Sequence, residues 1–231
     1  MNSTTDTVLP LEAPRASAAL ALMAFVLCYP LFSMFVVPHE PAASSALGEI
    51  RARLSNEAPR WLYASTALFL ALRWQRCAPA VLGLRKPDAR TVLVGVLGCV
   101  LAFALAVGAK LALRGWPQPP DDPAAIARMV HGSLAYAAIM AVGAGFVEES
   151  LYRSILITEV TRLTRRPVLS VFLSGVAFVT AHGLTYNWVQ LSMAAMATIA
   201  LSVIYVWRRD LAANVLAHAL IDLVSFAHAL Q

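Results

Sequence analysis

Apolar segments long enough to cross a lipid bilayer recur along nearly the whole chain. A hydrocarbon core about 30 Å thick is crossed by a helix of about 20 apolar residues. We predict about seven such spans, at residues 16–37, 58–74, 91–113, 131–161, 167–182, 187–207 and 211–229. The predicted fold class is therefore all-α, a polytopic bundle of transmembrane helices. A soluble domain is excluded, because only 13% of the residues are charged, against about 25% in soluble proteins.

The second span is the least regular of the set. Its uninterrupted apolar run, from Trp61 to Leu72, covers about two-thirds of a normal span. It is compatible with a re-entrant or interfacial segment, and equally with a helix that extends backwards through Ile50 and Leu54. A longer helix of this kind leaves room for an eighth span.

Basic residues favour one side of the predicted membrane. Loops on that side contain Arg15, Arg73, Arg76, Arg85, Lys86, Arg90, Arg162, Arg165, Arg166, Arg208 and Arg209, and the opposite loops contain Arg51, Arg53, Arg60, Lys110, Arg114 and Arg128. Loops rich in Lys and Arg stay in the cytoplasm. We therefore expect an integral protein of the bacterial cytoplasmic membrane with a cytoplasmic amino terminus. The net charge of +5 then reports topology, and we infer no nucleic-acid partner.

Residues 116–130 begin with a run rich in proline and aspartate, and proline cannot continue a helix. We predict an extended loop that separates amino-terminal membrane helices (1–115) from a carboxyl-terminal helical core (131–231). The spans before the loop contain almost no ionisable residue, whereas those after it contain nearly all the polar groups. The chemistry is therefore expected in the carboxyl-terminal half.

Ionisable and polar side chains occur inside three of the predicted spans. An ionisable residue in the middle of a membrane helix costs about 2.5 to 3.5 kcal/mol on insertion, so each one indicates a function. These residues are Glu148, Glu149 and Arg153 in one span, His182 in the next, and Asn214, His218 and Asp222 in the last.

The depths of these residues point to one common site. At about 1.5 Å per residue, Glu148, His182, Asp222 and His218 lie about 21, 22, 19 and 13 Å from the basic ends of their helices. Packing residues scattered at random would not converge in this way. We therefore expect the four side chains to meet within the membrane.

Helical spacing divides the two adjacent glutamates. Glu149 and Arg153 are four residues apart and can pair, which occupies Glu149 structurally. Glu148 is rotated by about 100° on the helix and is free to face elsewhere, as a general base must be. Gly143 and Gly145 precede the pair, and small residues there allow neighbouring helices to approach closely.

Three short motifs give the chain a resemblance to a known family. E-E-x-x-x-R is matched by Glu148, Glu149 and Arg153, F-x-x-x-H by Phe178 and His182, and H-x-x-x-N in part by His218 and Asp222. Together these motifs resemble those of the CAAX protease and bacteriocin-processing family of glutamic-type intramembrane proteases. The resemblance covers about residues 131–230.

The resemblance implies peptide-bond hydrolysis without a metal or other cofactor, on a membrane-associated protein or peptide substrate. By analogy, Glu148 and His182 activate a water, and His218 with residue 222 stabilises the oxyanion of the tetrahedral intermediate. Arg153 would hold Glu149 and the helix in place. Prenylated carboxyl termini, peptide leaders and carboxyl-terminal sorting tails are all compatible substrates.

The third motif departs from the family pattern, because residue 222 is Asp instead of Asn. An ionised carboxylate only accepts hydrogen bonds, so it would repel an oxyanion. Asp222 must then be protonated, or must orient His218, or must leave the donor role to Asn214.

Other interpretations of the same residues remain open. Glu149 and Arg153 form a purely structural ion pair in one of them, and Tyr152 is a packing aromatic. Two histidines with carboxylates also suit a zinc-dependent membrane peptidase, although the widely spaced Cys28, Cys77 and Cys99 indicate no thiolate site. A non-catalytic transporter or immunity-type binding protein would use the buried charges to relay protons or to dock a peptide.

Overall fold

The computed structural model describes residues 15–35, 46–117, 130, 133–183 and 185–230. Within these residues all regular elements are helices, which confirms the predicted all-α class. They are α1 (Ala16–Leu27), α2 (Tyr29–Phe35), α3 (Ala46–Arg73), η1 (Pro79–Leu82), α4 (Ala89–Ala112), α6 (Leu134–Glu148), η2 (Glu149–Ile157), α7 (Thr158–Thr164), α8 (Pro167–His182), α9 (Trp188–Arg208) and α10 (Leu211–Ala229). α6, η2 and α7 follow one another without a break, and η2 is a π-helix.

Hydrogen-bonded caps fix where several of these helices begin. Asp88, Asn187 and Asp210 precede α4, α9 and α10, and each accepts a hydrogen bond from a backbone N–H of the first turn. Such caps satisfy backbone donors that have no partner within the helix. The apolar segments of the sequence therefore become helices with defined starts, which fixes the register of the residues they carry.

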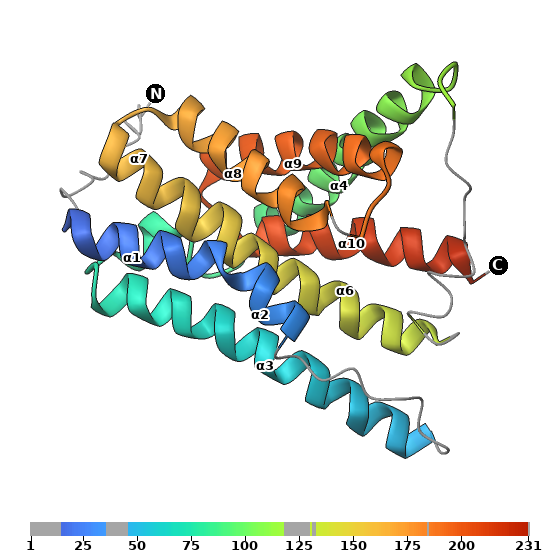
Figure 1. Ribbon diagram of the computed structural model, residues 1–231, viewed down its shortest axis with the longest axis horizontal. Helices are drawn as coiled ribbons and strands as arrows, with labels where there is room; N and C mark the ends of the chain where they lie inside the picture. Colours follow the sequence, from blue (N-terminus) through green and yellow to red (C-terminus); the bar gives the residue numbers. More distant parts are fainter. Residues whose placement is uncertain (1–14, 36–45, 118–129, 131–132, 184, 231) are drawn as a thin grey trace.

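The π-helix η2 lies at the centre of the bundle. It contacts α1, α3, α8, α9 and α10, and all nine of its residues are buried. In Figure 1, α1 and α3 lie on one side of the continuous α6–η2–α7 segment, and α4, α8, α9 and α10 lie on the other. The adjacent glutamates stand at the junction of α6 and η2, so the fold places them in its interior.

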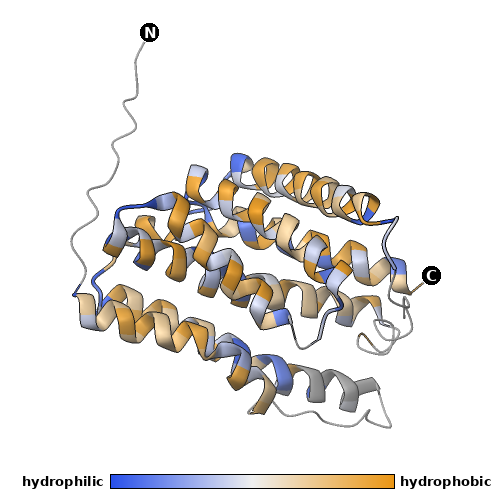
Figure 2. Cartoon of the chain, turned by 45° about the horizontal axis from the view of Figure 1, so that its top comes forward, coloured by the Kyte–Doolittle hydropathy of each residue, from blue (hydrophilic) through white to orange (hydrophobic). Residues whose placement is uncertain are grey.

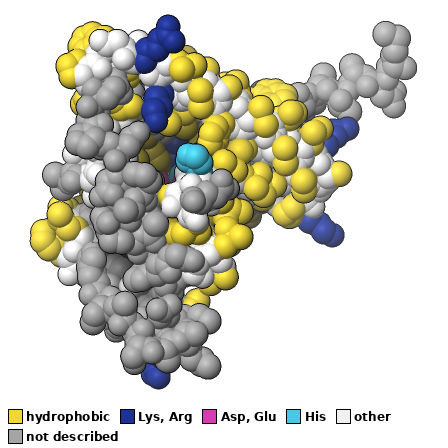
Figure 3. Space-filling view, turned by 90° about the vertical axis from the view of Figure 1, so that its right-hand side faces the viewer, with side chains coloured by type: hydrophobic (Ala, Val, Ile, Leu, Met, Phe, Trp, Pro, Cys, Tyr) yellow, Lys and Arg dark blue, Asp and Glu magenta, His cyan; other side chains and the backbone are white. Residues whose placement is uncertain are grey.

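The outer surface of the bundle is apolar. α4 presents Leu93, Leu97 and Val100 outwards, and Val100 is 60% exposed. Figure 2 shows hydrophobic residues along most of each helix, and Figure 3 shows hydrophobic side chains over most of one described face. Five described helical segments are long and apolar enough to cross a membrane: Ala16–Phe35, Ala89–Ala112, Leu134–Thr164, Trp188–Arg208 and Leu211–Ala229. α8 is apolar but shorter.

The predicted span at residues 58–74 is only the second part of α3. The helix begins at Ala46 and includes Ile50 and Leu54, as the longer of the two interpretations expected. Charged residues in its first half keep α3 out of the group of five apolar helices. The count of seven or eight spans therefore stays a prediction. Residues 36–37, most of the expected loop (118–129) and residues 131–132 lie outside the described residues.

Two arginines expected in loops lie inside helices. Arg60 is part of α3 and pairs with Glu57, and Arg162 is part of α7 and pairs with Glu159. The Arg162 guanidinium also donates to the sulfur of Cys77, and Arg162 is only 4% exposed. These two arginines are structural groups, so they carry less information about topology than the sequence suggested.

Candidate active site

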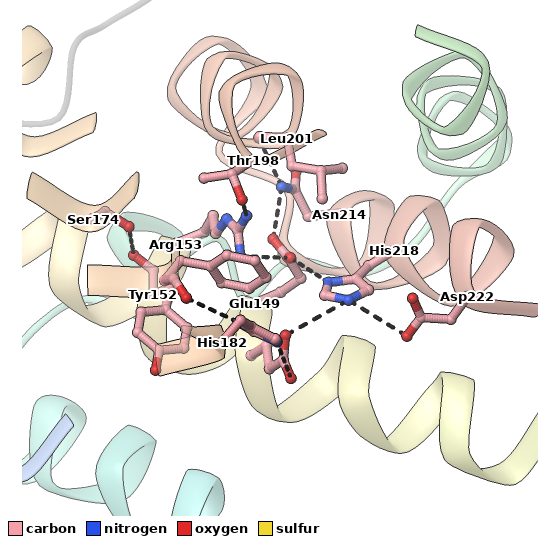
Figure 4. A network of polar contacts seen from close by, with 12 residues as sticks. Glu149, Tyr152, Arg153, Ser174, His182, Thr198, Leu201, Asn214, His218 and Asp222 are labelled. Atoms are coloured by element: carbon pink, nitrogen blue, oxygen red, sulfur yellow. Dashed lines mark hydrogen bonds and ion pairs between the residues drawn. The ribbon is translucent and has the colours of Figure 1, made fainter. Parts of the chain in front are cut away.

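Three separate helices bring the predicted polar residues together (Figure 4). Glu148 ends α6, Glu149 begins η2, and His182 ends α8. Asn214, His218 and Asp222 follow one another at four-residue intervals along α10. The expected convergence within the bundle is therefore present in the structure, at the point where α6 passes into η2.

Glu149 is fully buried and is the centre of a hydrogen-bonded network. Its Oε1 lies 3.0 Å from Nη1 of Arg153 and 2.7 Å from Nδ1 of His218. Its Oε2 accepts a hydrogen bond of 3.1 Å from the amide of Asn214. The sequence predicted the pairing with Arg153, but the contacts with α10 could not be read from spacing. Glu149 therefore ties the π-helix to α10 as well as to Arg153.

Arg153 is held on its other sides as well. Its Nη2 donates to the hydroxyl of Thr198 on α9 at 3.1 Å. Its guanidinium also lies 4.4 Å from the ring centroid of Phe178 on α8, within the range of a cation–π contact. A buried charge needs both a counter-ion and hydrogen bonds to be tolerated, and Arg153 has both.

Glu148 lies between the two histidines and is 16% exposed. Its Oε1 is 3.9 Å from Nε2 of His182, and its Oε2 is 3.7 Å from Nε2 of His218. Both separations are longer than a direct hydrogen bond, so the Glu148 carboxylate is bonded directly to neither ring. Glu148 is thus the partly exposed glutamate of the pair, whereas Glu149 is enclosed.

The Nδ1 atoms of both histidines already have hydrogen-bond partners. Nδ1 of His182 lies 2.9 Å from the carbonyl oxygen of Phe178, and a carbonyl can only accept. Nδ1 of His218 lies against the carboxylate of Glu149, which also accepts. Each Nδ1 therefore carries a hydrogen, and each Nε2 is directed toward Glu148.

Asp222 and Asn214 differ in how far their polar atoms are already bonded within the protein. Oδ2 of Asp222 is 3.6 Å from Nε2 of His218, and the side chain is 25% exposed. The amide nitrogen of Asn214 donates both its hydrogens, to Glu149 and to the carbonyl oxygen of Leu201 at 2.8 Å. Asn214 has no hydrogen left for an oxyanion. It is Glu149, and not Asp222, that fixes the Nδ1 side of His218.

The local backbone explains how these groups come so close. A Cβ atom added to Gly145 would lie 2.9 Å from the carbonyl oxygen of Val215, so α6 and α10 meet at van der Waals distance there. In the π-helix, backbone hydrogen bonds skip one residue more than in an α-helix, and such segments are frequent at functional sites. The hydroxyl of Ser174 donates to the carbonyl of Tyr152 within η2 at 2.7 Å. This contact anchors α8 to the π-helix.

Comparison with known proteins agrees with this arrangement. Residues 130–224 match the family model described as type II CAAX prenyl endopeptidase Rce1-like. This segment is similar to the CAAX protease family. The match confirms the resemblance seen in the sequence, and it includes every polar residue described above for the site. Together with the long apolar helices, this match indicates an integral membrane protein. No curated protein and no solved structure gives a match.

Two groups near Glu148 lie outside the residues that match the family model. The carboxylate of Glu57 on α3, outside the matched residues, interacts electrostatically with Glu148. Tyr29 on α2 interacts with both carboxylates. We predicted almost no ionisable residue in the amino-terminal spans, and Glu57 lies just before the predicted span at 58–74. The only signal in the sequence was the pairing of Glu57 with Arg60 at helical spacing.

Among the described residues, no three His, Cys, Asp or Glu side chains are placed to hold a metal ion together. The three cysteines are free, and Cys77 is buried beside Glu159 and Arg162. Burial raises the pKa of the Cys77 thiol to about 12, and the neighbouring Glu159 adds to this effect. Cys77 is therefore an unreactive thiol.

Proposed function

We propose that this protein is an intramembrane endopeptidase of the glutamic type, which hydrolyses a peptide bond in a membrane-associated protein or peptide. One observation carries the proposal: the Glu148 carboxylate lies between the Nε2 atoms of two histidines from different helices, at 3.9 and 3.7 Å. A carboxylate in this position can take a proton from a water that both groups bind.

In the proposed first step, Glu148 acts as the general base. The water bridging Glu148 and Nε2 of His182 gives a proton to the carboxylate while its oxygen attacks the scissile carbonyl. The Phe178 carbonyl keeps the hydrogen of His182 on Nδ1, so a neutral ring offers a lone pair at Nε2 to orient the water. The proton taken up by Glu148 then passes to the departing amine.

His218 stabilises the oxyanion in this proposal. As an imidazolium it donates from Nδ1 to Glu149 and from Nε2 to the developing negative charge, and ionised Glu149 supports that form of the ring. Single oxyanion donors contribute about 2.7 to 4 kcal/mol to transition-state stabilisation. Arg153 and Asn214 act through Glu149, since they hold its carboxylate in place.

The proposed mechanism uses no metal, and a direct measurement separates it from a zinc peptidase. The purified protein is analysed for metals and assayed before and after dialysis against a chelator. We expect unchanged cleavage. A stoichiometric metal ion whose removal abolishes cleavage would replace the water-activation step with a metal-dependent one.

The setting of the reaction is also part of the proposal. We propose seven or eight membrane spans in the bacterial cytoplasmic membrane, an amino terminus in the cytoplasm, and a catalytic core at residues 131–231. The description of the matched family names prenylated CAAX substrates, and peptide leaders and sorting tails suit the same chemistry. The substrate would reach Glu148 from the bilayer, in keeping with the apolar outer surface of the bundle.

The decisive experiment replaces Glu148 by Gln. Membrane-bound peptides from cells with the wild-type protein and with Glu148→Gln are compared by mass spectrometry. We expect the product peptides to disappear, while thermal unfolding of the purified variant stays close to that of the wild type. Glu57→Gln is the matched control, because it removes a nearby carboxylate outside the site and should leave the products unchanged. Intact cleavage by a folded Glu148→Gln variant would refute the proposal.

A further inference from the structure

Tyr186 is placed at the site by the short connection between α8 and α9. Its backbone N–H donates to the carbonyl oxygen of His182 at 2.9 Å, one of several bonds that fix this turn to the end of α8. The rings of Tyr186 and His182 are in contact, with centroids 4.8 Å apart and an interplanar angle of 46°. The backbone bond and the ring contact together hold Tyr186 beside His182.

The phenol of Tyr186 also lies close to two carboxylates of the site. It interacts electrostatically with Asp222 and with Glu148. Although 41% of Tyr186 is exposed, desolvation of its phenol, and then the negative charges of Asp222 and Glu148, raise the pKa of Tyr186 above its usual value. The hydroxyl therefore keeps its proton at physiological pH. Tyr186 is therefore a neutral donor within electrostatic reach of Asp222 and Glu148.

The hydroxyl of Tyr186 is available. Among the described residues, none forms a hydrogen bond with it. The other tyrosines near Glu148 are less suitable. Tyr29 shares a hydrogen bond with Ser33. Tyr152 points its hydroxyl away from His218 and Asp222 in Figure 4.

Among the described residues considered for the oxyanion site so far, only His218 has a side-chain donor to spare. His218 provides one donor, Asn214 has no free hydrogen, and Asp222 only accepts when it is ionised. We propose that Tyr186 is a catalytic residue whose hydroxyl donates a hydrogen bond to the oxyanion formed on the scissile carbonyl. This inference rests on the proposed peptidase function. The hydroxyl keeps its proton throughout, so no bond to Tyr186 forms or breaks.

A simpler role for Tyr186 is that of an aromatic anchor at the membrane surface, stacked on His182. The two roles differ in what the hydroxyl does. Stacking and anchoring depend on the ring, which Tyr186→Phe keeps, whereas oxyanion binding depends on the O–H, which Tyr186→Phe removes. This single substitution therefore separates them.

The assay uses a fluorogenic prenylated peptide that ends in a CAAX sequence. If that peptide is not cleaved, the assay uses the natural peptide located by comparison with Glu148→Gln. We expect Tyr186→Phe to lower kcat by about 10²-fold with KM changed by less than about threefold, as for loss of one oxyanion donor. Tyr136→Phe is the matched control, since its ring packs in a separate cluster with Val130 and Ala137. A kcat for Tyr186→Phe equal to that of the control would overturn the inference.

A second pair of variants tests whether Tyr186 compensates for Asp222. Asp222→Asn introduces an amide that can donate to the oxyanion. In the Asp222→Asn background, Tyr186→Phe should lower kcat by less than about fivefold, because a second donor is present. An equal loss in both backgrounds would show that the Tyr186 hydroxyl does not substitute for the missing amide. If Tyr186→Phe is silent while Glu148→Gln is inactive, the inference fails and the proposed peptidase function stands.

Discussion

The amino-terminal and carboxyl-terminal regions each contain an ion pair formed within one helical segment, and the two differ mainly in their surroundings. Glu57 and Arg60 on α3 are 3.1 Å apart, with side chains 6% and 28% exposed. Glu149 and Arg153 are 3.0 Å apart, and both side chains are fully buried. The distances are nearly the same. Among the described residues, only the second pair forms hydrogen bonds to other helices, namely to α9 and α10.

This difference shows what makes a buried charge pair part of a site. The α3 pair lies beside Gly143, and Glu57 interacts electrostatically with Glu148. The Glu149–Arg153 pair fixes the ring of His218 and thereby the direction of its Nε2 atom toward Glu148. Two ion pairs with nearly the same N–O distance are therefore expected to contribute differently to the site. Substitution of Glu57, Glu148 and Glu149 by Gln can separate effects on activity from effects on stability.

Glu149→Gln should produce the largest loss of stability. It leaves Arg153 as a buried charge without a counter-ion, which costs about 3–5 kcal/mol. We expect the free energy of unfolding, measured by denaturant titration in detergent micelles, to fall by that amount, and cleavage to be lost as well. Glu148→Gln is the control, because Glu148 is partly exposed and pairs with no arginine among the described residues. Equal stability of the two variants would remove the distinction between a structural and a catalytic glutamate.

The sequence predicted part of this distinction. The four-residue spacing of Glu149 and Arg153, and the intramembrane positions of Glu148, His182 and His218, were sufficient to place these groups near one another. Local spacing carries that information because it follows from helix geometry. The Asn214 and His218 contacts of Glu149 join positions far apart in the chain, so no local pattern could reveal them.

Other features could not be predicted from the sequence, each for a different reason. The π-helix of η2 has the residue types of an α-helix, and tertiary contacts such as that from Ser174 accompany its altered hydrogen bonding. α3 begins with charged residues that resemble a loop, yet Glu57 is only 5% exposed. In the sequence, Tyr186 is an aromatic residue near a helix end and carries no further signal. Its contact with the ring of His182 depends on the turn that follows α8.

Gly145→Ala should have the next largest effect, within the carboxyl-terminal region. The added methyl group would meet the backbone carbonyl of Val215 at 2.9 Å, and backbone cannot move aside as a side chain can. Forcing α6 and α10 apart should cost about 1–3 kcal/mol of unfolding free energy and lower cleavage, since this contact sets the distance from Glu148 to His218. Gly108→Ala is the control, because nothing lies within 4 Å of its added methyl group.

Gly143→Ala tests the contact between the two regions and should have a smaller effect. Its added methyl group would lie 2.5 Å from Oε2 of Glu57, but that atom is the end of a flexible side chain. Glu57 can rotate away at the expense of its bond to Arg60, and the better helix propensity of Ala offsets about 1 kcal/mol. We expect a net change in unfolding free energy below about 1 kcal/mol. A loss as large as that of Gly145→Ala would mean that α3 is held as rigidly as α10.

The Glu57–Arg60 pair itself should show the smallest energy of the series. Arg60 is partly exposed, its Nε has no hydrogen-bond partner among the described residues, and partly exposed pairs contribute about 0.2–1 kcal/mol. A double-mutant cycle with Glu57→Gln and Arg60→Gln isolates that coupling energy from the other effects of each substitution. The cycle is read by denaturant titration and repeated on the cleavage assay. A coupling of several kcal/mol, or a loss of cleavage with Glu57→Gln alone, would extend the site into the amino-terminal region, because the α3 carboxylate would then act on Glu148 directly.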